Sequence, residues 1–164
     1  MRLAIAAMWL LQVVANPQET PHLQLKTSAS VGAVAAGGKV TLQIDVTPKP
    51  KMHVYAPGQD GYIAITVKLD PQPAFSTTGK AKYPDPEKIV IPALNESQLV
   101  YDKPFRITQD ITLAQKSGSA PLVIKGTIRY QACTDKICYL PTSVPVTWTV
   151  NPAARTTAPA RRGF

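Results

Sequence analysis

Hydrophobic and polar residues alternate with a period of two along most of this chain. The alternation is clearest in segments 40–46, 105–113 and 122–130, where one side of each segment is mostly apolar. Successive side chains of a strand point to opposite faces, so Val40, Leu42, Ile44 and Val46 would share one face. Many of the residues in these segments are also β-branched or aromatic. The pattern therefore predicts β-strands.

Other segments complete the set of expected strands. They are 22–27, 52–55, 62–69, 88–91 and 144–150, with a less regular strand within 75–83. Turns rich in proline and glycine separate them. Segment 92–102 lacks a clear period, so we expect a loop there. About eight or nine closely spaced strands without a convincing helix predict an all-β fold built as a two-sheet sandwich.

The two ends of the chain differ in composition from its middle. Residues 1–15 carry one positive charge, then an apolar run that ends on a small residue. This pattern predicts a secretory signal peptide, and a buried N-terminal helix is the alternative. The run is shorter than the about 20 residues of a membrane helix, so we expect no membrane span in the mature chain. Residues 151–164 predict a disordered basic tail, which leaves 16–150 as one exported domain.

Charge and histidine content exclude some functions. The net charge is +8, but Arg155, Arg161 and Arg162 lie in the expected tail. The remaining basic residues form no cluster with a recognition motif, so we expect no nucleic-acid partner. The only histidines are His22 and His53, which are too few for a usual zinc site. We expect neither a metal nor a cofactor.

The two cysteines lie between two predicted strands. Cys133 and Cys138 are separated by residues 134–137, a common length for a hairpin connection. Facing residues on antiparallel strands have Cα atoms roughly 4.5–5.5 Å apart, and a disulfide needs about 4.4–6.8 Å. Closing so small a loop stabilises a fold by only about 2 kcal/mol. The spacing therefore favours a reversible redox pair over a structural bridge.

Two segments carry a resemblance to a known family. Residues 130–141, YQACTDKICYLP, resemble the active-site segment of the N-terminal periplasmic domain of the thiol:disulfide interchange protein DsbD. Residues 52–63, MHVYAPGQDGYI, resemble an early segment of the same family. The resemblance extends from His22 to Val150 and implies an immunoglobulin-like β-sandwich. It also implies a reversible cysteine pair that relays electrons between thioredoxin-like proteins outside the cytoplasm.

The resemblance also implies roles for the cysteines. Cys138 would form mixed disulfides with partner proteins, and Cys133 would resolve them. This chain has four residues between its cysteines, one fewer than the best-known family member. The shape of the loop and its fit to partners could therefore differ.

Four further residues are expected to line the cysteine pair. His53 and Tyr55 match early positions that line the pair in the family. A histidine is a departure there, and it would either tune a thiolate near neutral pH or pack beside the sheet. Leu94 is our candidate for the residue that caps the pair, and Tyr139 is expected to serve in packing more than in chemistry.

The leading hypothesis is a monomeric, periplasmic or otherwise exported domain with protein-disulfide reductase activity. Its partners would be thioredoxin-like or DsbD-type membrane redox proteins. The family protein also has a membrane part and a thioredoxin-like part that this sequence does not contain, so we expect a separate electron donor. Two alternatives stay open. One is a non-catalytic immunoglobulin-like binding module with a structural disulfide, and the other is a copper-handling domain that uses Cys133, Cys138, Met52 and His53.

Overall fold

The computed structural model describes residues 17–91, 96–115 and 120–153. In these ranges the regular secondary structure consists of β-strands, which are joined by turns and loops. They are β1 (Gln18–Glu19), β2 (Leu23–Ala29), β3 (Ala33–Val34), β4 (Lys39–Pro48), β5 (His53–Tyr55), β6 (Thr66–Leu69), β7 (Phe75–Lys82), β8 (Glu87–Ile91), β9 (Glu96–Tyr101), β10 (Phe105–Leu113), β11 (Leu122–Tyr130), β12 (Ala132–Cys133) and β13 (Thr142–Pro152). The described residues contain no helix that could cross a lipid bilayer. The predicted signal peptide at 1–15 lies outside the described ranges.

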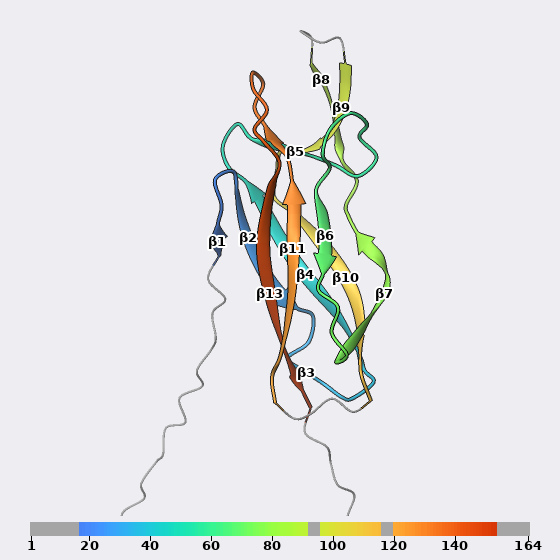
Figure 1. Cartoon of the computed structure of the whole chain (residues 1–164). Helices are drawn as coiled ribbons and strands as arrows, with labels where there is room; N and C mark the ends of the chain where they lie inside the picture. Colours follow the sequence, from blue (N-terminus) through green and yellow to red (C-terminus); the bar gives the residue numbers. More distant parts are fainter. Residues whose placement is uncertain (1–16, 92–95, 116–119, 154–164) are drawn as a thin grey trace, which may run out of the picture.

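Two sheets form the body of the molecule, and a third lies at one end. The first sheet has the order β1-β2-β4-β10-β7, and the second has the order β3-β13-β11-β6 (Figure 1). All neighbours pair antiparallel except β3 and β13. The third sheet, β12-β5-β9-β8, lies at the end where the hairpin between β11 and β13 projects (Figure 1). The predicted all-β, immunoglobulin-like sandwich is confirmed.

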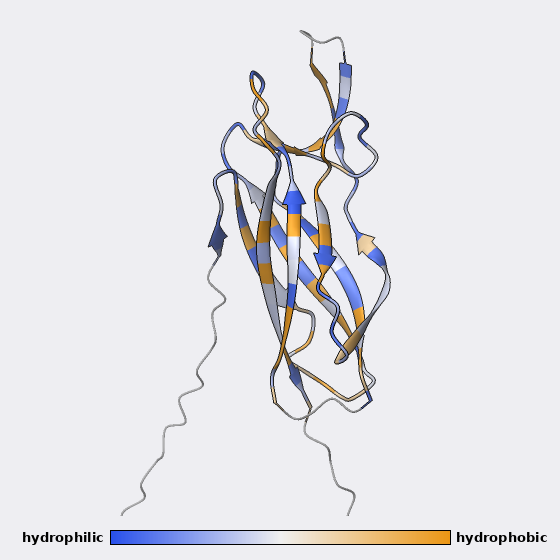
Figure 2. Cartoon of the chain, in the orientation of Figure 1, coloured by the Kyte–Doolittle hydropathy of each residue, from blue (hydrophilic) through white to orange (hydrophobic). Residues whose placement is uncertain are grey.

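Alternation along the strands produces the core between the two sheets. In β4, every second side chain from Val40 onward is buried, and β10, β11 and β13 repeat this pattern (Figure 2). Trp148 is the largest fully buried side chain, and its Nε1 donates a hydrogen bond to the carbonyl oxygen of Gln43 at 3.0 Å. This bond joins β13 of one sheet to β4 of the other. The same apolar core reaches the end that carries the cysteines, because Val54 of β5 and Ala132 of β12 belong to it.

Two of the strand predictions are wrong. The expected loop at 92–102 contains β9, which pairs with both β8 and β5. The sequence pattern missed it because Gln98, a polar residue, occupies a buried position of the strand. The expected strand at 62–69 is reduced to β6, Thr66–Leu69. Residues before β6 leave the sheet because they bend across the end of the sandwich, where the Ile65 amide donates to the Tyr55 carbonyl at 2.8 Å.

The C-terminal boundary of the domain also differs from the expected one. β13 continues to Pro152, where it pairs in parallel with β3, so the sandwich extends two residues beyond Val150. Most of the predicted tail, 154–164, lies outside the described residues.

Gly126 provides a test of the packing between β11 and its neighbours. A Cβ atom at this position would lie 2.7 Å from the Lys68 carbonyl oxygen and 3.2 Å from the Trp148 ring. We expect Gly126→Ala to lower the free energy of unfolding by about 1–3 kcal/mol, the usual effect of overpacking. Urea denaturation measures this change. Gly32→Ala is the matched control because nothing lies within 4 Å of its added Cβ. Equal stability of the two variants would contradict the packing described here.

Candidate functional site

A short hairpin at one end of the sandwich carries both cysteines. The amide of Thr134 donates to the carbonyl of Ile137 at 2.8 Å, which closes the turn. The Thr134 hydroxyl oxygen also accepts bonds from the amides of Lys136 at 3.2 Å and Ile137 at 3.1 Å. Below the turn, the Tyr139 amide donates to the Ala132 carbonyl at 2.9 Å. The predicted hairpin connection at 134–137 is confirmed.

Cys133 and Cys138 form a disulfide across this hairpin. Their Cα atoms are 4.0 Å apart, and the two residues form an antiparallel bridge. Their environments differ strongly, because Cys133 is 1% exposed whereas Cys138 is exposed. β12 pairs with β5, so that Cys133 faces His53. One cysteine of the pair is therefore held in the protein, and the other is at the surface.

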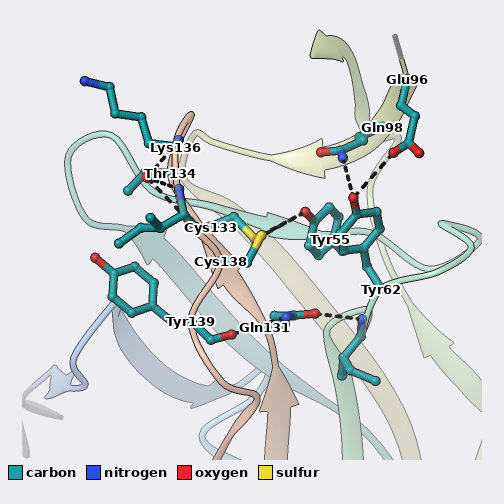
Figure 3. The surroundings of a disulfide bond; sticks show 12 residues. Tyr55, Tyr62, Glu96, Gln98, Gln131, Cys133, Thr134, Lys136, Cys138 and Tyr139 are labelled. Carbon is teal, nitrogen blue, oxygen red and sulfur yellow. Dashed lines mark hydrogen bonds between the residues drawn. A yellow bond between two sulfur atoms is a disulfide. The ribbon is translucent and has the colours of Figure 1, made fainter. Parts of the chain in front are cut away.

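Tyr55 lies against both sulfur atoms. Its hydroxyl oxygen is 3.2 Å from Cys133 Sγ and 3.5 Å from Cys138 Sγ (Figure 3). Sulfurs of a disulfide carry no proton, so the tyrosine hydroxyl is the donor. Burial, with smaller contributions from Tyr62 and Glu96, raises the pKa of Tyr55 to about 12. The hydroxyl therefore keeps its proton at neutral pH and stays available as a donor to sulfur.

Tyr62 holds Tyr55 in place, and the sequence analysis did not single it out. The two rings stack with centroids 4.2 Å apart. The Tyr62 hydroxyl accepts a bond from Gln98 Nε2 at 3.1 Å and donates to Glu96 Oε2 at 3.4 Å (Figure 3). Tyr62 lies in the early segment that carries the family resemblance, which was a usable signal. Gln98 had no such signal because its strand was expected to be a loop.

Gln131 fixes the base of the hairpin, and it was also missed. Its Nε2 donates to the Tyr139 carbonyl at 3.2 Å, and its Oε1 accepts from the Ile63 amide at 3.2 Å (Figure 3). One side chain thus ties the returning arm of the hairpin to the segment that precedes β6. The position of the disulfide relative to Tyr55 and Tyr62 is therefore defined from both sides.

His53 lies beside the pair in a buried position. It faces Cys133 in the ladder, and its ring meets Tyr55 edge-on with centroids 5.7 Å apart. Burial lowers the pKa of His53, and the nearby Asp102 carboxylate partly opposes this effect. Its Nε2 is buried and has no hydrogen-bond partner among the described residues. The two expected roles of His53, tuning the pKa of a thiolate and packing beside the sheet, stay predictions.

Tyr139, another of the expected lining residues, does not join this group. The Tyr139 ring lies on the other side of the hairpin from Tyr55 (Figure 3). It packs against His22 with ring centroids 4.4 Å apart. Leu94, the candidate cap residue, lies outside the described residues.

The surface around Cys138 is hollowed, and it combines polar and apolar side chains. Ile137 is 55% exposed and Leu140 is 86% exposed, and these residues flank Cys138 in sequence. A hollow of about 90 Å³ opens beside the disulfide, with Tyr55, Tyr62 and Cys138 in its walls. A reacting group can therefore approach Cys138 from outside, whereas Cys133 is covered.

The copper alternative remains a prediction. Met52 directly precedes His53, which faces Cys133, so the proposed ligand types do gather at this end. Both thiols are engaged in the disulfide. Across the described ranges, there is no group of three or more His, Cys, Asp or Glu residues that could hold a metal ion.

Comparison with known proteins gives one family and several structures. The family model described as "Thiol:disulfide interchange protein DsbD, N-terminal" matches residues 20–148. A search of curated protein sequences found no match. The N-terminal periplasmic domain of ScsB from Proteus mirabilis is similar with a TM-score of 0.54 at 16% identity, covering 81% of this chain and 49% of that one. The chain thus spans about half the length of that domain.

Two further solved structures are less similar. The GAE domain of yeast GGA1 has a TM-score of 0.46 at 8% identity, covering 82% of this chain and 98% of that one. The seventh ScaB type I cohesin from Pseudobacteroides cellulosolvens has a TM-score of 0.43 at 9% identity, covering 85% and 97%. At these scores neither likeness bears on function.

The unequal burial of the two cysteines predicts unequal reactivity. After reduction of the folded protein, we expect iodoacetamide to modify Cys138 several times faster than Cys133, because only Cys138 is at the surface. Peptide mass spectrometry of samples quenched at short times measures both rates. In concentrated urea the two rates should converge. Equal rates in the folded protein would contradict the described burial.

We expect the hydrogen bond from the Tyr55 hydroxyl to affect the reduction potential of the cysteine pair. A thiolate accepts a stronger hydrogen bond than a disulfide sulfur, so the hydroxyl favours the reduced pair. Loss of about 0.5–1.5 kcal/mol in Tyr55→Phe would make the potential about 10–30 mV more negative. Equilibration with glutathione buffers measures it. Tyr139→Phe is the control, since the Tyr139 ring packs against His22 on the other side of the hairpin. A potential in Tyr55→Phe that is unchanged or higher would refute this role.

Proposed function

The chain belongs to the family of N-terminal domains of the thiol:disulfide interchange protein DsbD, and from this premise we propose that it relays electrons through Cys133 and Cys138. The observation that carries the proposal is the bonded pair with one cysteine exposed and the other buried. Exchange needs an accessible sulfur for attack and a second sulfur to resolve the mixed disulfide. Cys138 supplies the first and Cys133 supplies the second.

Reduction of the pair takes two steps. A thiolate of the electron donor attacks Cys138 Sγ, which forms a mixed disulfide and breaks the bond to Cys133. Cys133 leaves as a thiolate, and the Tyr55 hydroxyl 3.2 Å away stabilises its charge. The second thiolate of the donor then attacks the donor sulfur that is bonded to Cys138, and Cys138 is released as a thiolate. The donor becomes a disulfide, and the pair has gained two electrons and, after protonation, two protons.

Delivery of the electrons follows the same steps in reverse. The Cys138 thiolate attacks the disulfide of an oxidised partner, and one partner sulfur leaves as a thiolate. Cys133 then attacks Cys138 Sγ, re-forms the internal disulfide and releases the second partner thiolate. The surrounding body need not change, because the sandwich core does not include the hairpin turn.

We assign the partners to thioredoxin-like proteins and DsbD-type membrane redox proteins. The exposed Ile137 and Leu140 beside Cys138 support a protein partner, because exposed apolar side chains around a reactive group are typical of interaction surfaces. A periplasmic or otherwise exported location is supported by the structural neighbour, which is named as a periplasmic domain. Disulfides also persist in such compartments. The domain would act as a monomer, without a cofactor, because the cysteines themselves carry the electrons.

Single cysteine variants test the assigned roles. We expect Cys133→Ser to accumulate a mixed disulfide with an oxidised thioredoxin-like protein, because the internal thiol that completes the exchange is absent and only the partner's own freed thiolate can reverse the bond at Cys138. Cys138→Ser should form no such adduct and should lose turnover. Non-reducing gel electrophoresis and a coupled thiol assay measure the two effects. Unchanged exchange by Cys138→Ser would refute the proposal.

The reduction potential separates the relay from a structural bridge. A relay is expected at roughly −120 to −270 mV, the range of thioredoxin-like proteins. A potential below about −300 mV would instead favour a non-catalytic binding module with a permanent disulfide.

A further inference from the structure

A larger cleft adjoins the hollow at Cys138. Its volume is about 650 Å³, within the roughly 300–1,000 Å³ of small-molecule sites. It shares His53, Ile91 and residues 134–136 with the hollow beside the disulfide, so the two meet along one wall. A molecule held in the cleft could therefore extend to the exposed sulfur of Cys138.

Unpaired charges of both signs surround this cleft. Lys51 and Lys136 provide cations, whereas Asp102 and Asp135 provide anions, and all four residues are exposed. None of them forms a salt bridge within the ranges that the structure describes, although other charged residues there do. The rim can therefore engage a ligand that carries ammonium and carboxylate groups together.

The inner wall combines apolar surface with one polar atom. Met52, Ile89 and Ile91 are partly buried and give the wall its apolar area. His53 is 7% exposed, and its buried Nε2 has no hydrogen-bond partner among the described residues. Because this atom is closed off from solvent, a ligand in the cleft meets mainly the apolar side chains of the wall.

We propose that the cleft binds a small disulfide with amino-acid ends, of which cystine is the simplest, and presents its sulfurs to Cys138. This inference rests on the proposed function, because it requires the reduced cysteine pair. The ammonium and carboxylate groups of the ligand match the mixed charges of the rim, and its size matches the cleft. The domain would thus reduce small amino-acid disulfides as well as proteins.

The chemistry balances with the two electrons of the pair. The Cys138 thiolate attacks one sulfur of cystine, forms a cysteinylated Cys138 and releases one cysteine thiolate. The Cys133 thiolate then attacks Cys138 Sγ, re-forms the internal disulfide and releases the second cysteine thiolate. Cystine is reduced to two cysteines, which take up the two protons that the protein thiols lost. The protein pair is oxidised and needs a donor of the proposed kind to be reduced again.

Competition between a charged and an uncharged disulfide tests the cleft. The reduced protein is mixed with cystine or with hydroxyethyl disulfide, and its oxidation is followed by mass spectrometry after acid quenching. The rate of oxidation by cystine is divided by the rate of oxidation by hydroxyethyl disulfide. This ratio is then divided by the same ratio measured with dithiothreitol in place of the protein, which corrects for the intrinsic reactivity of each disulfide. We expect a normalised ratio severalfold above one for the wild-type protein.

Variants that remove one charge each test whether the preference for cystine comes from the rim of the cleft. Lys51→Met and Asp102→Asn should each lower the normalised ratio about two- to fivefold, the effect of losing one partly exposed ion pair. Lys88→Met is the matched control, because Lys88 is an exposed lysine of β8 that does not line the cleft. It should leave the ratio unchanged.

The outcomes separate the two proposals. A wild-type ratio near one, or equal ratios in all variants, would overturn the cleft assignment. The proposed relay would still stand if the same reduced protein exchanged with a thioredoxin-like partner. Failure to react with cystine, hydroxyethyl disulfide and that partner alike would overturn both.

Discussion

The pairing of β12 with β5 determines the chemistry of this molecule. It is a short ladder, in which Ala132 faces Val54 and Cys133 faces His53. Because of this register, Cys133 is held inside the protein, where it contacts the Tyr55 hydroxyl. Four residues of tight turn then return the chain to Cys138 at the surface. The disulfide therefore joins a buried sulfur, that of Cys133, to the sulfur of the exposed Cys138.

In the exchange that we propose, that asymmetry would set the direction of attack. An incoming thiolate meets Cys138 first, and the sulfur that leaves is the one already supplied with a hydrogen-bond donor. The Tyr55 hydroxyl holds its proton at neutral pH, since its pKa, raised to about 12 mainly by burial, lies far above 7. Tyr62 stacks on it and is itself held by Gln98. The site is thus a rigid aromatic support under a small, exposed loop.

The body of the sandwich and the end that carries the cysteines share a core, but a small second cluster surrounds Cys133. Trp148 and the alternating aliphatic residues of the two main sheets form one core, whereas Tyr55, Val100 and Cys133 form a small second cluster. Of the two cysteines, Cys133 belongs to this second cluster, and its neighbour Ala132 belongs to the main core. The cleft beside it uses residues of β5, β8 and the hairpin turn, so one end of the molecule combines apolar contact surface, charged groups and reactive sulfur.

The sequence by itself determined the strands of the body and the bridge between the two cysteines. Period-two alternation predicted β4, β10 and β11, and cysteine spacing between two strands predicted the hairpin bridge. These features depend on residues that are close together in the chain, so the order of residues in the sequence is enough to predict them. The tertiary structure decided which cysteine is buried, why Tyr62 and Gln131 matter, and that β9 exists around a buried glutamine. Each of these depends on contacts between residues far apart in the chain, and no periodicity along the chain encodes such contacts.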